Sequence, residues 1–392
     1  MYVGDDSGVL HKFTGVFNGT PAEITGGGTA SGWPQTMTGG GILTSPVLDA
    51  TDGMVFVAGS GGFLFRIPPG GGSTNLVISG QLAVTGSTGI VDAPIVDNTP
   101  STPEVYVMVG DNNQNAGRGS VDRFPPTFPA ASLGTFVTIG TGVTTTAIYD
   151  GDFDNIHYSG SGSTGSFYVC GYHGSGTIPR LFEVDIATFT GTPTTIGTIA
   201  GTHGTCSPVT EFLNTGSGGA AVTTLSAAIT TVGQTAVSVT SGTNIGTGRY
   251  IQVGTEDMQV TAGGGTSSLT VTRGALGTTA ATHFVTSNVL IPQLDWMYMS
   301  TTAGGSPVTG CTTGDCIYDY EISTALVATS APTAALVATG GTSGIIIDNS
   351  TITAGESQIY YTTLANQACV GNGTTGNATG GCAVQVSQSG LN

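Results

Sequence analysis

Positive charge is the scarcest property of this 392-residue chain. It has seven lysine and arginine residues, with Lys12 as the single lysine, against 24 acidic residues, and its formal net charge is −17. Nucleic-acid phosphates and anionic membrane surfaces both require clustered basic side chains. The composition therefore argues against nucleic acid as a partner. The excess of acids has two interpretations, which are solubility through like-charge repulsion and binding of cations.

Strong helix formers and long apolar runs are also rare. Charged residues make up 8% of the chain, while 65 residues are glycine and much of the remainder is threonine, serine and valine. Threonine and valine suit half-buried pleated sheets, and glycine suits the turns between strands. We therefore predict an all-β protein with almost no helix. No apolar run approaches the length of a membrane span, so we predict no membrane span.

The chain has no CxxC or CxxCH motif, which argues against a zinc site and excludes covalent c-type haem. It does contain an even number of cysteines, namely Cys170, Cys206, Cys311, Cys316, Cys369 and Cys382. The last four form two pairs that are close in sequence, and a disulfide within each pair would close a hairpin. Cys170 and Cys206 would then pair by elimination, although spacing alone does not prove connectivity. The cysteines and the near-absence of lysine favour an extracellular protein, secreted or on a cell surface.

The N-terminal stretch Met1–Val9 resembles a strand and turn rather than a signal peptide. For an extracellular protein this suggests a mature or truncated N-terminus, with the signal sequence outside this chain.

An internal repeat dominates the sequence. Each copy is an aromatic or β-branched strand, a glycine-rich turn and a second strand. The copies are Met1–Phe13, Met54–Ile67, Glu104–Phe124, Ser166–Ile186, Asp295–Ile322 and Gln358–Gln388. A short apolar strand that ends in an acid precedes most copies, and the acids are Asp49, Asp97, Asp150, Glu211 and Asp348. An aspartate there can bond its own backbone and start the next turn.

A fourth, more polar strand often follows each copy, so the repeat predicts four antiparallel strands per unit. Four-stranded units at roughly 45-residue spacing are typical of propeller blades. We predict a β-propeller with six to seven four-stranded blades.

One interval of the repeat is much longer than the others. It contains alternating segments that predict a small β-sandwich or barrel-like module inserted into a loop. We therefore predict the first part of the propeller at 1–214, an inserted domain at 215–292 and the final blades at 293–392. Loops on rigid scaffolds often carry binding surfaces.

Two resemblances follow from particular segments. Tyr2–Pro21, Gly340–Asn349 and Cys382–Asn392 resemble secreted bacterial β-propeller repeat proteins of the acidobacterial type. That resemblance implies a fold and an extracellular location but no activity. Thr223–Ser241, Ile251–Thr261 and Val271–Phe284 resemble a small β-module of phage tail and virion-associated proteins, which implies a surface or assembly unit.

The best candidate for a metal site is an acidic loop. Asp150, Asp152 and Asp154 occupy alternate positions, and calcium prefers several oxygen ligands from one loop. The alternative is an ordinary acidic turn. A second acidic pair, Glu256 and Asp257, resembles a hairpin tip.

No arrangement in the sequence predicts a catalytic residue or an organic cofactor. The five histidines are His11, His157, His173, His203 and His283. We interpret His157, His173 and His203 as surface or turn residues, with a metal-binding trio or a catalytic base as the alternatives. No GxSxG motif opens a helix, and the Trp-rich repeat of quinone-dependent propellers is absent.

The leading hypothesis is a non-enzymatic extracellular structural protein, such as a filament, surface-layer or adhesion component. Its propeller would act as the scaffold and its insert would make contacts, either with other copies of the chain or with a cell-surface or glycan partner. Sparse charge leaves strand edges poorly protected, which favours association. The alternatives are an extracellular polysaccharide-acting hydrolase or lyase, and a propeller that binds a glycan or small ligand.

Overall fold

The fold is taken from a computed structural model of the chain. It describes residues 1–26, 32–86, 88–143, 146–173, 178–196, 204–214, 216–243, 245–302, 311, 315–324, 326–348, 358–369 and 379–387. The chain forms two compact units. The first is Met1–Val209 with Met299–Ser306 and Val327–Ser330, and the second is Thr210–Tyr298 with Pro307–Leu326 and Ala331–Asn392.

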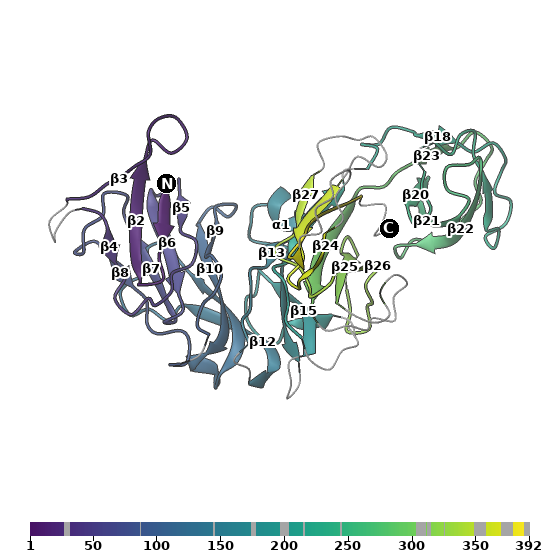
Figure 1. The fold of residues 1–392 in the computed structure, drawn as a ribbon. Helices are drawn as coiled ribbons and strands as arrows, with labels where there is room; N and C mark the ends of the chain where they lie inside the picture. The colour runs from purple at the N-terminus through teal and green to yellow at the C-terminus, as the bar shows by residue number, and fades with distance from the viewer. Residues whose placement is uncertain are drawn as a thin grey trace. The chain divides into compact units, whose positions relative to one another are not determined.

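The first unit opens with two antiparallel four-stranded sheets (Figure 1). The strands of the first sheet are β1 (Tyr2–Gly4), β2 (Val9–Thr14), β3 (Ala22–Glu23) and β4 (Gln35–Thr36). The strands of the second sheet are β5 (Val47–Asp49), β6 (Met54–Gly59), β7 (Phe63–Ile67) and β8 (Val77–Ile78). The second sheet has the predicted order of acid-ended strand, aromatic strand, glycine turn and third strand.

Two further four-stranded groups follow in the first unit. The strands of the third group are β9 (Ile95–Asp97), β10 (Glu104–Asn112), β11 (Arg118–Phe124) and β12 (Thr135–Val143). The strands of the fourth group are β13 (Asp152–Phe153), β14 (Ser166–His173), β15 (Ile178–Asp185) and β16 (Thr194–Ile196). A single parallel pairing between Gly140 and Tyr172 joins the two groups into one eight-stranded sheet.

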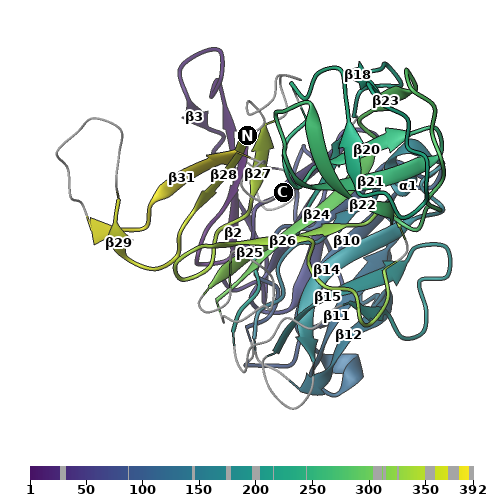
Figure 2. The same ribbon diagram turned by 90° about the vertical axis from the view of Figure 1, so that its right-hand side faces the viewer.

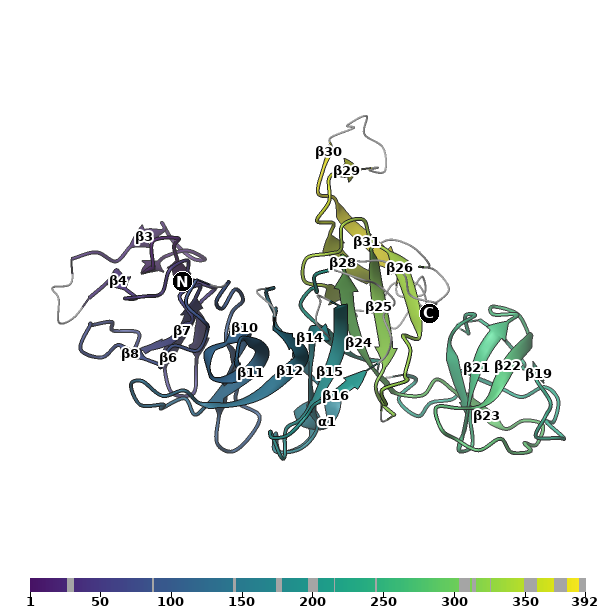
Figure 3. The same cartoon turned by 90° about the horizontal axis from the view of Figure 1, so that it is seen from below.

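The second unit contains three main sheets (Figures 1 and 2). One joins, in spatial order, β17 (Thr210–Asn214), β24 (Leu294–Thr301), β25 (Cys316–Glu321) and β26 (Ala334–Val337). Another joins β27 (Ile346–Asp348), β28 (Gln358–Thr362) and β31 (Ala383–Ser387). A short hairpin of β29 (Gln367–Ala368) and β30 (Thr379–Gly380) extends from the ends of β28 and β31 (Figure 3).

The third main sheet of this unit lies wholly inside the segment that interrupts the repeat. Its six strands are β18 (Thr223–Thr224), β19 (Ala236–Ser238), β20 (Tyr250–Val253), β21 (Glu256–Ala262), β22 (Ser268–Ala275) and β23 (Asn288–Leu290). Their spatial order is β18-β23-β20-β21-β22-β19. The buried side chains of these strands and their loops form a separate hydrophobic core between Leu225 and Val289.

Helix is as scarce as the composition predicts. In the described part of the chain it consists of α1 (Asn155–Ser159) and the single 3-10 turn η1 (Asn113–Asn115). The prediction of an all-β protein is therefore confirmed, with several antiparallel sheets along the chain.

Consecutive sheets of the first unit pack face to face because β6 is buried on both sides. One of its faces packs with the first sheet in a cluster that includes Leu10, Trp33, Val55 and Val57. Its other face packs with the third group of strands in a cluster that includes Phe56, Ala58, Val105 and Val107. Tyr106 continues this stacking, since its ring lies 5.4 Å from that of Phe153 and 5.8 Å from that of Phe167 in the fourth group.

All three predicted disulfides are present. Cys170 pairs with Cys206, Cys311 with Cys316 and Cys369 with Cys382. The last pair closes the β29–β30 hairpin, as its spacing predicted. No helix in the described residues has the length and apolar character needed to cross a membrane.

Candidate functional site

The predicted calcium ligands Asp150, Asp152 and Asp154 serve separate local contacts. Asp154 caps α1 and accepts hydrogen bonds from the backbone amides of His157 at 2.8 Å and Ser166 at 2.9 Å. Asp152 accepts a hydrogen bond from the Tyr158 hydroxyl at 2.7 Å. The structure therefore places two of the three carboxylates at the start of one short helix, where each is already engaged.

Asp150 lies apart from these contacts. Burial, followed by the nearby charges of Asp92 and Asp152, raises the pKa of the Asp150 carboxyl to about 8. Such a group holds a proton at neutral pH. Among the described residues, no group of three or more His, Cys, Asp or Glu side chains is arranged to hold a metal ion. Calcium binding stays a prediction.

His157 was predicted at the surface or in a turn, and this prediction is wrong. Its side chain is fully buried, with Nε2 2.8 Å from the Asp97 carboxylate and the ring 4.1 Å from that of Phe153. Burial opposes the charged form of His157, but the hydrogen bond and the charge of Asp97 outweigh it, so its pKa is raised. The imidazole thus ties the end of β9 to α1. His203, a member of the alternative metal-binding trio, lies outside the described residues.

Asp49 and Asp97 make the turns that the repeat predicted. The Oδ1 atom of each accepts a hydrogen bond from the backbone amide two residues later, at 2.8 Å and 2.9 Å. Asp49 also accepts a hydrogen bond from the Asn98 side chain at 3.2 Å. At these two positions the acid therefore has a structural role, and Asp49 also links its turn to the next one.

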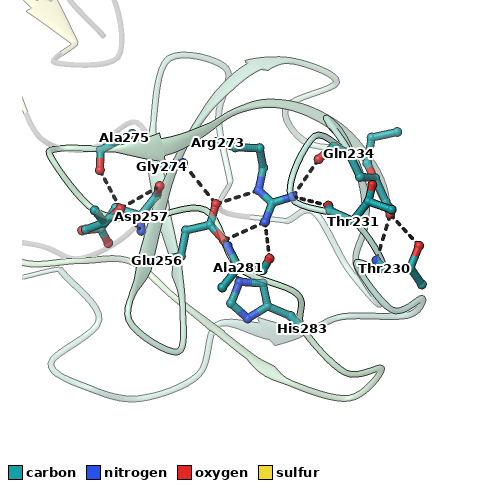
Figure 4. A network of polar contacts seen from close by, with 12 residues as sticks. Thr230, Thr231, Gln234, Glu256, Asp257, Arg273, Gly274, Ala275, Ala281 and His283 are labelled. Carbon is teal, nitrogen blue, oxygen red and sulfur yellow. Dashed lines mark hydrogen bonds and ion pairs between the residues drawn. The ribbon is translucent and has the colours of Figure 1, made fainter.

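A polar network with several charged members lies in the inserted module (Figure 4). Glu256, at the start of β21, is completely buried. It forms a bidentate ion pair with Arg273 of β22. Arg273 Nε lies 2.6 Å from Oε1 and Nη2 lies 2.7 Å from Oε2. His283 Nε2 lies 2.7 Å from the same Oε2, and the amides of Gly274 and Ala281 also donate to the carboxylate.

Electrostatics keep Glu256 ionised despite its burial. Desolvation alone would raise the pKa of the carboxyl, but the bonds from Arg273, Ala281 and His283 outweigh it, and the pKa falls to about 2. The guanidinium is equally well satisfied, because it also donates to the carbonyl oxygens of Thr231, Gln234 and Ala281. A buried charge with this many partners stabilises one arrangement of the chain around it.

This network fixes two loops side by side. Arg273 holds the loop at 230–234, and Glu256 holds the segment at 281–283. Ile229 and His283 join the two segments by reciprocal backbone hydrogen bonds of 2.9 Å and 3.0 Å. Large apolar side chains on these loops face the solvent, namely Val232 at 58% exposure, Phe284 at 85% and Val285 at 50%.

Glu256 lies at a hairpin tip, as the sequence indicates, because it pairs with Val253 across the two-residue turn between β20 and β21. The hairpin-tip interpretation does not predict that the Glu256 and Asp257 side chains are buried. A usable signal was present, because Glu256 and Arg273 both border alternating apolar segments in a chain that is only 8% charged. Charges in such positions are buried only when they are paired.

Neither a protein-family model nor a curated protein matches the chain. Among solved structures, the chain is similar to the crystal structure of the Saccharomyces cerevisiae Sqt1, with 11% sequence identity over 92% of this chain and 89% of that chain. The TM-score is 0.33, which does not establish a shared fold.

Proposed function

We propose that the protein is a non-enzymatic extracellular structural or interaction protein, a filament, surface-layer or adhesion component. In this proposal a β-propeller of six to seven blades is the scaffold, and the insert makes the contacts. The observation that carries the proposal is the buried Glu256–Arg273–His283 network, which fixes two loops that present Val232, Phe284 and Val285 to solvent.

The propeller is supported by the way in which successive sheets pack. In the first unit, β6 buries both of its faces, one against the preceding strands and one against the following strands. In the second unit, Trp296 and Tyr298 of β24 share a cluster with Ile359 and Tyr361 of β28. Face-to-face packing of successive sheets is what the blades of a propeller require.

The disulfides support a location outside the cell, and two exposed apolar residues support a role in contacts. The three disulfides are typical of proteins that fold in an oxidising compartment. The exposed residues Phe284 and Val285 have few charged residues near them in the sequence, because the chain has only seven lysine and arginine residues. An exposed apolar patch on a rigid loop is typical of an interaction surface.

Rigidity is what makes these loops suitable for contacts. A loop that is already held in place loses little conformational freedom on binding, so more of the buried apolar area contributes to affinity. Arg273 and Glu256 supply that rigidity from inside the module. We propose a second copy of the chain as the partner of this patch, with a cell-surface partner as the alternative.

Self-association tests the proposal directly. Electron microscopy and sedimentation of the purified protein should show ordered polymers or discrete oligomers. Phe284→Ser should weaken the association about tenfold or more, because a large exposed side chain is lost from the contact. Phe17→Ser is the matched control, since Phe17 is 92% exposed in the turn between β2 and β3 of the other unit.

Single particles at all concentrations would contradict self-association. Equal effects of Phe284→Ser and Phe17→Ser would contradict the role of the insert. Cleavage of a polysaccharide by the purified protein would contradict a non-enzymatic role.

A further inference from the structure

A cavity of about 360 Å³ lies where β10 begins and β11 ends. Its lining comprises Thr102, Pro103, Glu104, Arg123, Phe124, Pro125, Ser132, Gly134 and Thr135. This volume is near the lower end of the range of ligand pockets, roughly 300–1,000 Å³, and suits one or two sugar rings. The cavity lies entirely within the first unit, far in sequence from the insert.

An ion pair forms the polar centre of this cavity. Arg123 Nη1 lies 3.3 Å from Glu104 Oε2, and the Tyr106 hydroxyl donates a hydrogen bond of 2.6 Å to the same oxygen. The guanidinium stacks on the ring of Phe189, 4.2 Å from its centroid. Tyr106 and Phe189 are buried. The contact with Tyr106 therefore fixes the Glu104 carboxylate, and the contact with Phe189 fixes the Arg123 guanidinium.

Glu104 and Arg123 can each form further hydrogen bonds with a molecule in the cavity. Among the described residues, Glu104 Oε1 accepts no hydrogen bond, and Arg123 donates from its side chain through Nη1 alone. Each side chain is about one quarter exposed. An acceptor and a donor therefore stand next to each other on a rigid base, beside the hydroxyls of Thr102, Ser132 and Thr135.

We propose that this cavity binds a neutral saccharide through a pair of neighbouring hydroxyl groups. One sugar hydroxyl donates to Glu104 Oε1 while its neighbour accepts from Arg123. Pro103 and Pro125 provide apolar surface for the carbon face of the ring. A neutral ligand fits because the arginine charge is already balanced by Glu104, and the −17 net charge of the chain disfavours anionic ligands.

A second cavity of about 240 Å³ gives room for a longer chain of sugars. It is lined by Val137, which follows Thr135 by two residues on β12 and shares its face of the strand, and by Thr188 and Thr190 on either side of Phe189. Glu183 and further threonines complete its polar lining. Because β12 contributes a lining residue to each cavity, an oligosaccharide fits better than a single sugar.

Titration of the full chain with cellotriose, xylotriose and mannotriose tests the proposal, using calorimetry and saturation-transfer NMR. At least one of these should bind. Arg123→Lys should weaken binding about tenfold, because it loses the planar fork that stacks on Phe189. Arg118→Lys is the matched control, since Arg118 is exposed on the same strand, outside the cavity, and it should leave binding unchanged.

Glu104→Gln separates a binding role from a structural one. This variant removes the negative charge that balances Arg123, so neutral trisaccharides should bind more weakly while glucuronate should bind more strongly than to the unaltered chain. A purely structural ion pair would not produce that exchange of preference. Circular dichroism and the melting temperature verify that each variant folds.

Two results would overturn the proposal. One is the absence of binding to all three trisaccharides by the unaltered chain. The other is binding that Arg123→Lys and Glu104→Gln change no more than Arg118→Lys does. Neither result depends on self-association through the insert, so the two proposals are tested separately.

Discussion

Arg273 and Glu256 lie 17 residues apart and form a two-pronged ion pair inside the inserted module, with N–O distances of 2.6 Å and 2.7 Å. Both side chains are almost completely buried. The main effect of such a pair on the fold is that removing either partner leaves the other charge buried without a counter-charge, which is strongly unfavourable.

Removing one partner of the Glu256–Arg273 pair should lower the free energy of unfolding of the insert. Arg273→Leu leaves the Glu256 carboxylate buried without its principal counter-charge, which costs about 3–5 kcal/mol. Urea unfolding should show this loss. Arg118→Leu removes an exposed arginine and should change stability by less than about 0.5 kcal/mol. Combining Glu256→Leu with Arg273→Leu should cost less than the sum of the two single changes.

Acid should weaken the insert. The pKa of Glu256 is near 2 in the fold, below the ordinary value of 4.5, so the folded state prefers the ionised carboxylate. The resulting stabilisation is fully present above about pH 4.5 and is lost as the pH falls toward 2. Unfolding curves between pH 6 and pH 2 should show this loss in the unaltered chain. If Glu256→Gln shows the same acid dependence, another group is responsible.

Asp319 should have the opposite pH dependence. It is completely buried in β25, and burial raises the pKa of its carboxyl to about 7 from 3.8. The folded state therefore prefers the protonated form, and stability falls as the pH rises from about 4 to 7, by up to about 4 kcal/mol. Asp319→Asn keeps an acceptor for the Ala334 amide and should flatten this part of the stability profile. A profile as steep as before would contradict the assignment.

The three disulfides should differ in their contribution to stability. Their sequence separations are 36, 13 and 5 residues for Cys170–Cys206, Cys369–Cys382 and Cys311–Cys316. Chain entropy then gives stabilisations of about 4, 3 and 2 kcal/mol in that order. Replacing each pair by alanines and measuring urea unfolding should reproduce this ranking. A larger loss for Cys311–Cys316 than for Cys170–Cys206 would contradict it.

Much of the local structure was predictable from the sequence. The strands, their glycine turns and the acid at the end of β5 and β9 follow from alternation and turn chemistry, which act over a few residues. The disulfide pairing also followed from spacing, because two of the three pairs close short loops.

The candidate sites were not predictable in the same way. His157 meets Asp97 across 60 residues, and Arg123 meets Glu104 only because β10 and β11 pair in one particular register. The alternate positions of Asp150, Asp152 and Asp154 suggested a single site, but α1 begins there and its cap engages Asp154 in hydrogen bonds to the backbone.

The class of fold and the repeat follow from short-range patterns of side chains, and loop closure favours the observed cysteine pairs over the other pairings. Which charges are buried and paired depends instead on contacts between segments that are distant in the sequence. Burial of Glu256 is favourable only when Arg273, His283 and two backbone amides converge on it, and that convergence depends on how whole strands and loops pack.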